Sequence, residues 1–288
     1  MTTQPTWLLK SEYPFESNYF DHQGVKQHYI DVGKGETLVF VHGTPSWSFD
    51  FRNVIKVLAL SYRCIAIDHI GFGLSAKPAD FDYSPQAHAQ RLEAFISHKK
   101  LTDLTLVLHD FGGPIGLAYA LRHPANVKRI VILNSWIGSS KDDPEFIRFT
   151  RLLKSPLLPF LYLYLNFSPR FLLPASFGSK KLPAYLRSQF TKPFASVSQR
   201  YGTLAFAHAL LNDQEWFEYL WSNRQLLGDV SCLFIWGLKD RFITEKYLDK
   251  FKNGFSNHKT FLLSHAGHFP QEEEPDKVAA VIFDFCKS

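Results

Sequence analysis

The sequence predicts a doubly wound α/β fold with a mostly parallel sheet and a helical segment inserted between two strands. Two observations predict the sheet: short continuous apolar runs recur along the chain, and helix-length amphipathic segments separate them. Continuous apolarity is typical of strands buried on both faces of a parallel sheet, and its alternation with helices is typical of doubly wound folds. A third observation predicts the insertion, because residues 137–228 show no buried-strand signal and instead predict short helices.

The composition is that of a folded protein with a large core. The chain has 288 residues, of which 45% are hydrophobic and 16% aromatic, and Phe alone occurs 27 times. A chain of this length buries about 75% of the surface that it exposes when unfolded. Charged residues make up 20% of the chain, less than the usual share of about 25%, and this excludes intrinsic disorder.

The first predicted strand belongs to a hairpin near the N-terminus, because residues 25–31 alternate between apolar and polar side chains. Residues 37–41, TLVFV, form the first continuous apolar run, which ends at His42-Gly43. The same pattern recurs in five later segments, at residues 63–67, 104–108, 129–133, 232–236 and 260–263.

Helices are predicted between and after these strands, at residues 51–60, 85–100, 114–123 and 275–286. The stretch without strands holds seven of the sixteen prolines and predicts short helices at residues 144–153, 157–167, 183–191, 197–211 and 214–226. We therefore expect a core domain of residues 1–136 and 229–288 and a helical cap of residues 137–228. In open α/β sheets the ligand lies beyond the carboxyl ends of the strands, so the cap would cover the site.

Charge and targeting signals predict neither a nucleic-acid nor a membrane partner. The chain has 32 Lys and Arg against 27 Asp and Glu, a net charge of +5, and no basic run is longer than a pair such as Lys99-Lys100. A scattered excess of this size bears on solubility rather than on nucleic-acid binding. The polar N-terminus predicts no signal peptide, and the most apolar segment, 157–165, is shorter than the ~20 residues that span a bilayer.

The three cysteines, Cys64, Cys232 and Cys286, have apolar neighbours. An odd number of cysteines in such surroundings is typical of buried free thiols in a reducing compartment, rather than of a disulfide framework or a zinc site. We therefore expect a cytoplasmic protein without a metal site.

The first candidate for chemistry is Asp110, which follows the run at 104–108 and precedes Phe111-Gly112-Gly113 and a predicted helix. A residue on a strand-to-helix turn followed by glycines matches a nucleophile elbow, with Asp where hydrolases usually hold Ser. The adjoining helix N-terminus keeps a carboxylate ionised, as a nucleophile must be. No Gly-x-Ser-x-Gly occurs in the chain. The alternative is that Asp110 only caps the helix.

Two further strand ends carry an acid and a base. Asp240 follows the run at 232–236 in WGLKD, and His268 follows the last run in SHAGHF. The order nucleophile, acid, base is that of the Ser-Asp-His triad in doubly wound hydrolases. The weaker candidates are His265 for the base and Asp142 or Asp143 for the acid.

A tight turn, His42-Gly43-Thr44-Pro45, follows the first continuous run. It can aim the N–H of Thr44 at the site, beside the N–H of Phe111, and two such donors make an oxyanion hole. We expect His42 itself to have a structural role.

Five motifs of the chain together resemble those of the aspartate-nucleophile α/β hydrolases, namely HGTPSW, DHIGFGLS, HDFGGPIG, WGLKD and GHF. This group includes haloalkane dehalogenases, epoxide hydrolases and haloacetate dehalogenases. The resemblance covers most of the chain outside the predicted cap, and HGTPSWSF, Asn134 and GHFPQEE look most like haloalkane dehalogenases. It implies that Asp110 displaces a leaving group from carbon to form an alkyl ester. His268, oriented by Asp240, would then activate water to hydrolyse that ester, with no cofactor.

Two positions depart from the dehalogenase pattern. The family normally has Trp after the nucleophile, whose indole N–H binds the halide, and Phe111 has no side-chain donor. The usual second halide ligand is Asn, or Glu in one branch, where this chain has Thr44. The haloacetate dehalogenases carry Arg after the nucleophile, so Phe111 disagrees with that branch also. For the substrate and leaving-group pocket we expect Trp47, Asn134 and Trp136, with Trp216 and Trp221 of the cap as further candidates.

Three alternatives to a dehalogenase remain open. An epoxide hydrolase would need cap tyrosines to protonate the alkoxide, and a β-lactone-processing enzyme has similar motifs. A non-catalytic receptor on the same scaffold could also retain a triad. The sequence implies a small apolar substrate and water as partners and leaves the oligomeric state open. The tyrosines available for epoxide opening are Tyr162, Tyr164, Tyr185, Tyr201 and Tyr219.

Overall fold

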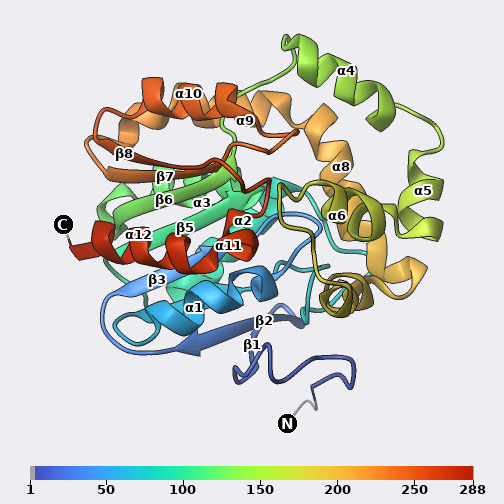
Figure 1. Cartoon of the computed structure of the whole chain (residues 1–288), viewed down its shortest axis with the longest axis horizontal. Coiled ribbons are helices and arrows are strands. Elements are labelled where there is room, and N and C mark those ends of the chain that lie inside the picture. The colour runs from blue at the N-terminus through green and yellow to red at the C-terminus, as the bar shows by residue number, and fades with distance from the viewer. Residues whose placement is uncertain (1–3, 288) are drawn as a thin grey trace.

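The computed structural model describes residues 4–287, except for the side chains of residues 149 and 152. Its centre is an eight-stranded sheet with the order β1-β2-β4-β3-β5-β6-β7-β8 (Figure 1). The first hairpin is antiparallel, β2 pairs antiparallel with β4, and the remaining neighbours are parallel. The predicted fold class is confirmed. The strands are β1 (Asn18–His22), β2 (Val25–Val32), β3 (Thr37–Val41), β4 (Arg63–Ile67), β5 (Leu104–Asp110), β6 (Val127–Ser135), β7 (Ser231–Gly237) and β8 (His258–Leu263).

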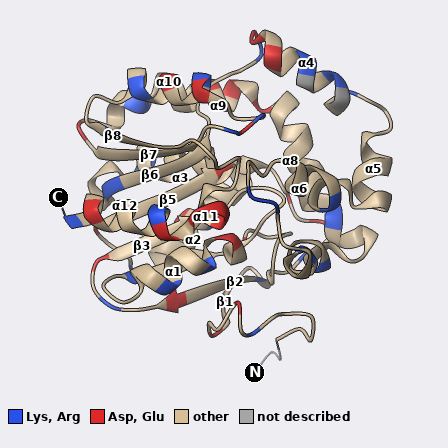
Figure 2. Ribbon diagram, viewed as in Figure 1, with Lys and Arg blue, Asp and Glu red and all other residues tan. Residues whose placement is uncertain are grey.

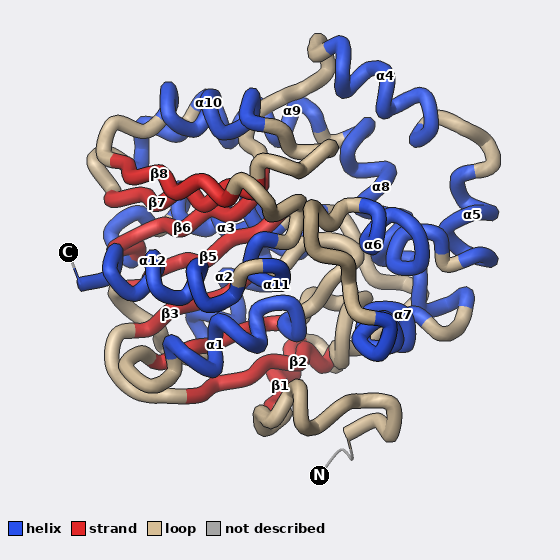
Figure 3. The backbone as a smooth tube through the Cα atoms, in the orientation of Figure 1, coloured by secondary structure: helices blue, strands red, loops and turns tan. Residues whose placement is uncertain are grey.

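The apolar runs form strands because both faces of the sheet are covered (Figure 3). Successive residues of β3 alternate between two core clusters: Val39 and Val41 belong to one, and Leu38 and Phe40 to the other. The first cluster includes side chains of α2 (Pro85–His98), α3 (Gly112–Arg122) and α10 (Glu245–Gly254). The second includes side chains of α1 (Arg52–Leu58) and α12 (Pro275–Lys287). This layering brings the parallel strands to one common carboxyl edge.

The segment between β6 and β7 is helical and lies beyond that carboxyl edge (Figure 1). Its division from the rest of the chain as a cap of residues 137–228 stays a prediction. The α-helices are α4 (Pro144–Leu153), α5 (Leu158–Leu165), α6 (Leu173–Ala175), α7 (Arg187–Thr191), α8 (Tyr201–Asn212) and α9 (Gln214–Ser222). Shorter helical turns lie at Ser168–Leu172, Ala184–Leu186, Lys192–Phe194, Val197–Arg200 and Arg224–Leu227.

Several elements are longer or additional relative to the sequence-based expectation. Strand β5 extends through Asp110, and β6 extends from Val127 to Ser135, because polar residues at their ends continue the pairing. Helix α10 and the short helix α11 (Pro270–Glu273) were not predicted. In α10 only Leu248 and Phe251 are buried, so the sequence of this segment has few apolar residues from which a helix could be predicted.

The three cysteines are buried free thiols, as predicted. Burial raises the pKa of both Cys64 and Cys232 to about 12, so these thiols are poor nucleophiles at neutral pH. Within residues 4–287 no helix is both long and apolar enough to cross a bilayer.

Candidate active site

Asp110 lies at the end of β5, where the chain turns sharply into α3. Its φ of 52° is in the left-handed region, as expected for the strained elbow that exposes a nucleophile. Small residues make this turn possible: a Cβ on Gly112 would collide with the backbone oxygen of Val41, and one on Gly113 with the Ser135 hydroxyl. The glycines after Asp110 thus let α3 approach the sheet.

The carboxylate of Asp110 is held by the turn that follows β3. The N–H of Thr44 donates to Asp110 Oδ1 at 2.7 Å, and a Cβ on Gly43 would collide with this carboxylate. Helix α3 has Phe111 as its N-cap residue and no side-chain cap, so the alternative that Asp110 only caps the helix is wrong. One carboxylate oxygen is fixed by a backbone donor, and the other lies 3.4 Å from His268 Nε2.

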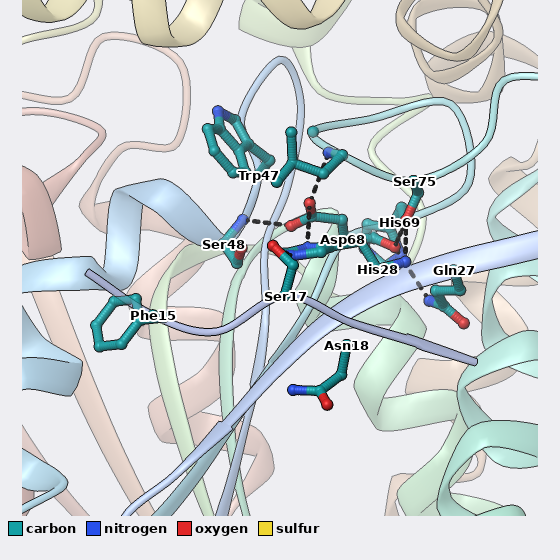
Figure 4. Close-up of polar contacts among 12 residues, drawn as sticks. Phe15, Ser17, Asn18, Gln27, His28, Trp47, Ser48, Asp68, His69 and Ser75 are labelled. Atoms are coloured by element: carbon teal, nitrogen blue, oxygen red, sulfur yellow. Dashed lines mark hydrogen bonds and ion pairs between the residues drawn. The ribbon is translucent and has the colours of Figure 1, made fainter. Parts of the chain in front are cut away.

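The buried carboxylate of Asp68, just after β4, holds the segment that follows the Thr44 turn, through the N–H of Ser48 (Figure 4). Asp68 Oδ1 accepts from the N–H of Ser48 at 2.9 Å, and Oδ2 accepts from the N–H of Leu74 and from His28 Nδ1, both at 2.8 Å. Burial alone would raise the pKa of Asp68, but the adjacent His28 and the backbone donor hold it below its ordinary value. Asp68 of the DHIGFGLS motif therefore links its own loop, at Leu74, to the chain at Ser48.

His268 joins two carboxylates from different strands. Its Nδ1 donates to Asp240 Oδ2 at 2.7 Å, while its Nε2 faces Asp110. The other oxygen of Asp240 accepts from the N–H groups of Phe242 at 2.8 Å and Ile243 at 3.1 Å. The structure thus brings together the three residues predicted as nucleophile, acid and base.

The charges at this site determine the protonation of His268. Burial acts to lower the pKa of His268, but the charge of Asp240 and hydrogen bonds with Asp110 and Asp240 raise it to about 10. Burial likewise acts to raise the pKa of Asp240, and His268 with two backbone donors lowers it below its ordinary value. The contacts with Asp240 and Asp110 therefore favour the imidazolium form of His268.

Asn134 lies beside Asp240 and does not line the cavity, which corrects its assignment to the substrate pocket. Its Nδ2 donates to Asp240 Oδ2 at 2.9 Å and to Gly237 O at 3.2 Å, and its Oδ1 accepts from the N–H of Gly237 at 2.8 Å. The side chain is fully buried at the end of β6. Asn134 therefore orients the acid rather than contacting a leaving group.

Trp47 also lies outside the cavity, against the sequence-based expectation. Its indole N–H donates to Gln189 O at 2.8 Å, and its ring packs 5.1 Å from that of Tyr13 and 5.3 Å from that of Phe49. The indole is fully buried in the second core cluster, because the chain after Pro45 turns away from Asp110. Its N–H is occupied and cannot bind a leaving group.

A cavity of about 240 Å³ opens beside Asp110 and His268. Thr44, Phe111 and Trp136 line it, and the oxyanion role of the first two stays a prediction. The Phe111 ring stacks on Phe206 at 4.3 Å and meets the edge of Trp136 at 4.7 Å. The far wall is apolar and comes from the inserted segment, with Phe146, Leu153, Tyr162, Leu173, Ala207 and Leu210.

Polar side chains gather at one end of this cavity. Ser140, Gln214 and Tyr247 line both the cavity and an adjoining, more polar hollow of about 800 Å³. Of the five tyrosines considered for epoxide opening, Tyr162 lines the cavity, and burial raises its pKa to about 12. The other four are exposed, namely Tyr164, Tyr185, Tyr201 and Tyr219.

The weaker candidates for acid and base lie apart from the triad. His265 and Asp142 are exposed, and Asp143 pairs with Lys246 at 2.8 Å. His42 is buried, and its two ring nitrogens bond Gly43 O and the N–H of His69, consistent with a structural role. Trp216 and Trp221 do not line the cavity.

Two residues missed by the sequence reasoning hold the loop of His268. His109 Nε2 donates to the backbone oxygen of His268 at 2.7 Å. Glu273 accepts from the N–H of Gly267 at 2.7 Å and of Gly178 at 2.9 Å, and burial raises its pKa to about 7. Both lie within recognised motifs, HDFGGPIG and GHFPQEE, which was the available signal. Among residues 4–287, no three His, Cys, Asp or Glu side chains are grouped as metal ligands.

Comparison with known proteins gives relatives over nearly the whole chain. A family described as alpha/beta hydrolase fold matches residues 36–275. Haloalkane dehalogenase 2 of Mycobacterium tuberculosis is 32% identical over 277 residues, covering 94% of this chain and 95% of the relative. A cis-3-alkyl-4-alkyloxetan-2-one decarboxylase of Shewanella oneidensis is 32% identical over 294 residues, covering 96% and 90%.

The fold is also that of solved structures. The haloalkane dehalogenase DatA from Agrobacterium tumefaciens C58 superposes with a TM-score of 0.85 at 24% identity, covering 94% of this chain and 95% of that one. At this identity the likeness bears on the fold alone.

Proposed function

The chain belongs to the α/β-hydrolase family and is an enzyme with haloalkane dehalogenases among its full-length relatives, and on that premise we propose how it acts. We propose a cofactor-independent hydrolase that forms an ester through Asp110 on small or medium apolar substrates. The observation that carries the proposal is the arrangement of Asp110, His268 and Asp240 at the floor of an apolar cavity. The proposal includes residues 137–228 as a cap and a cytoplasmic location.

In the first half-reaction Asp110 Oδ2 attacks a substrate carbon. The new C–O bond forms as the bond to the leaving group breaks, and the electron pair departs with that group. Thr44 holds Oδ1 at 2.7 Å, which fixes the direction of attack by Oδ2. The apolar wall around Asp110 replaces the hydration shell of the carboxylate, so that fewer water contacts oppose the attack.

In the second half-reaction His268 deprotonates water, which attacks the carbonyl carbon of the ester. The oxyanion forms on Oδ1, within reach of the Thr44 N–H, and we assign the N–H of Phe111 as its second donor. Collapse expels the alkoxide, which takes the proton from His268 and leaves Asp110 as a carboxylic acid. That acid then passes its proton to the neutral His268, which restores the carboxylate.

Ester formation also prepares His268 for this step. It removes the charge of Asp110, one of the two carboxylates that raise the pKa of His268 to about 10. The pKa therefore falls, and the imidazole can act as a general base near neutral pH.

A second candidate is ring opening of β-lactones, favoured by the missing halide donors. Phe111 and Thr44 provide no side-chain N–H beside Asp110, and one such donor is worth ~2.7–4 kcal/mol to a developing anion. Attack at the ring carbon that bears the alkyl oxygen breaks that C–O bond and releases a carboxylate, which delocalises its charge and stays tethered. Loss of carbon dioxide would then form an alkene and expel the Asp110 carboxylate, without water. The oxetanone decarboxylase relative supports this candidate.

A single-turnover reaction in ¹⁸O-labelled water, with enzyme in excess over a bromoalkane, tests the main proposal. We expect unlabelled alcohol and one labelled oxygen in Asp110, because the product oxygen comes from the carboxylate. Labelled alcohol in the first turnover would contradict the ester mechanism. A parallel reaction with a cis-dialkyl oxetanone tests the second candidate, which predicts alkene and carbon dioxide rather than a hydroxy acid.

A further inference from the structure

The inserted segment has an unusual distribution of charge that the net charge of the whole chain conceals. Residues 146–212 contain nine Lys and Arg and no Asp or Glu. Subtracting these nine from the 32 basic residues leaves 23 against 27 acidic ones in the rest of the chain. The positive charge of the protein therefore resides in this segment, whereas the remainder is slightly negative.

The same segment exposes a cluster of large apolar side chains. Among the described residues, six of the thirteen exposed large apolar side chains fall within residues 147–171. Tyr164 is 62% exposed and Phe160 52% exposed, and their rings stack at 5.4 Å one turn apart on α5. We call this cluster the outer face, and it consists of Ile147, Leu157, Phe160, Tyr164, Leu165 and Phe171.

Basic side chains border the outer face. Arg148 and Arg151 on α4, Lys154 after it and Arg170 beyond α5 are all exposed. None of these four has an ion-pair partner among the described residues. Figure 2 shows basic residues along α4, an acidic residue at its N-terminal end, and none of either charge on α5, and Figure 1 shows both helices at the outer edge of the molecule.

We propose that the outer face docks on the surface of an anionic phospholipid bilayer. Aromatic and leucine side chains bordered by Lys and Arg are typical of helices that lie in a membrane interface. Each basic residue near an anionic surface adds about fivefold to the partition coefficient. A second copy of this chain is a poorer occupant, because a twofold contact through this face would bring like charges together. The sequence predicted no membrane partner, and the grouping of charge and apolar surface is the reason to revise that prediction.

The docked position would place the cavity next to the membrane. Leu153 and Tyr162 line the cavity, while Lys154 and Phe160, one and two residues away, point outward and are exposed. Helices α4 and α5 thus form a wall between the cavity and the outer face. The docking proposal does not depend on the reaction catalysed, since it concerns the outer side of that wall.

Vesicle co-sedimentation of the full chain without substrate tests the proposal. We expect binding to vesicles of phosphatidylcholine and phosphatidylglycerol, little binding to phosphatidylcholine alone, and weaker binding as salt screens the charges. Equal binding to both vesicle types, or none to either, would overturn it. A dimer in lipid-free sedimentation velocity that Phe160→Ser disperses would also overturn it, because the face would then be an interface between copies.

Charge variants separate this face from a general effect of net charge. Arg148→Gln, Arg151→Gln and Lys154→Gln combined should lower the partition coefficient roughly a hundredfold. The control combines Lys26→Gln, Lys34→Gln and Lys100→Gln. These three lysines are exposed and lie outside the inserted segment, so the control removes the same charge from another part of the surface. If the control weakens binding as much as the cap variant, the docking face is misassigned.

Apolar variants test insertion. Phe160→Ser with Tyr164→Ser should lower the partition coefficient at least about tenfold, whereas Leu60→Ser, which alters an 86% exposed leucine after α1, should leave it unchanged. Phe160→Trp should show a fluorescence blue shift and quenching by brominated lipids, and Leu60→Trp should show neither. Quenching of both or of neither would contradict docking through α5.

Discussion

The two sides of Asp110 differ in their neighbours: one side is hydrogen-bonded and the other is aromatic. On one side, polar contacts of 2.7–3.4 Å run from the Thr44 N–H through Asp110, His268 and Asp240 to Asn134. On the other side of Asp110, Phe111 meets the rings of Trp136 and Phe206 and offers no side-chain donor to a leaving group. We therefore propose that the attacking and hydrolysing groups are held in place before substrate binds, whereas an aromatic surface selects the leaving group.

The largest expected effect comes from removing the nucleophile. Asp110→Asn keeps the shape and the Thr44 contact but cannot form the ester, so kcat should fall by roughly 10⁴-fold or more. Steady-state turnover and intact-mass spectrometry would measure this. Asp142→Asn, an exposed carboxyl considered as an alternative acid, is the matched control and should keep full activity. Substantial turnover by Asp110→Asn would show that Asp110 is not the nucleophile.

Binding of the leaving group can be tested by changing Trp136, the tryptophan that lines the cavity. If a halide leaves, Trp136→Phe should lower kcat on bromoalkanes about a hundredfold, because one N–H donor is worth about 10²–10³. If a β-lactone is the substrate, the same change should have little effect on ring opening. Trp216→Phe, which lies outside the cavity lining, is the control for loss of a tryptophan.

A smaller effect is expected where the acid is oriented. Asn134 has a φ of 25°, so Asn134→Gly removes the side chain without backbone strain. Loss of its hydrogen bond to the charged Asp240 should lower kcat about tenfold to a hundredfold, with KM little changed. Asn166→Gly, at another left-handed position with a φ of 52°, should be near wild type. A change in KM alone would contradict this role and would indicate that Asn134 contacts the substrate.

The smallest effect concerns stability against pH. The pKa of His268 is raised in the folded state from 6.5 to about 10, so its stabilising contribution is fully present below pH 6.5. The contribution is lost as pH rises toward 10. The free energy of unfolding should therefore fall more steeply across this window in the wild type than in His268→Gln. Chemical denaturation at a series of pH values measures the difference, and parallel curves would contradict the charged triad.

Much of the fold follows from the sequence because the strands are buried on both faces. Residues 37–41 and 63–67 were predicted with the bounds that the structure has, since every position there is apolar or at a strand end. The ends of β5 and β6 were missed because His109, Asp110, Asn134 and Ser135 are polar yet still paired in the sheet or buried at its edge. Local composition does not signal such positions.

The three residues of the proposed triad could be found from the sequence because each lies in a recognisable motif after a strand. The hydrogen-bond partners of other side chains could not be predicted from the sequence. Asn134 bonds Asp240 across 106 positions of the chain, which depends on how β6 and β7 meet. Trp47 lies three residues after Thr44, but its indole bonds Gln189 instead of facing the site. Such side-chain directions are set by tertiary packing.

The central claim is that Asp110 forms a covalent ester which His268 resolves. Intact-mass spectrometry of His268→Gln after incubation with substrate, followed by peptide mapping, tests it most directly. The account predicts an adduct of the substrate's alkyl group on Asp110 that accumulates in the variant and is absent from the wild type. Full turnover by His268→Gln, or an adduct on a residue other than Asp110, would contradict it.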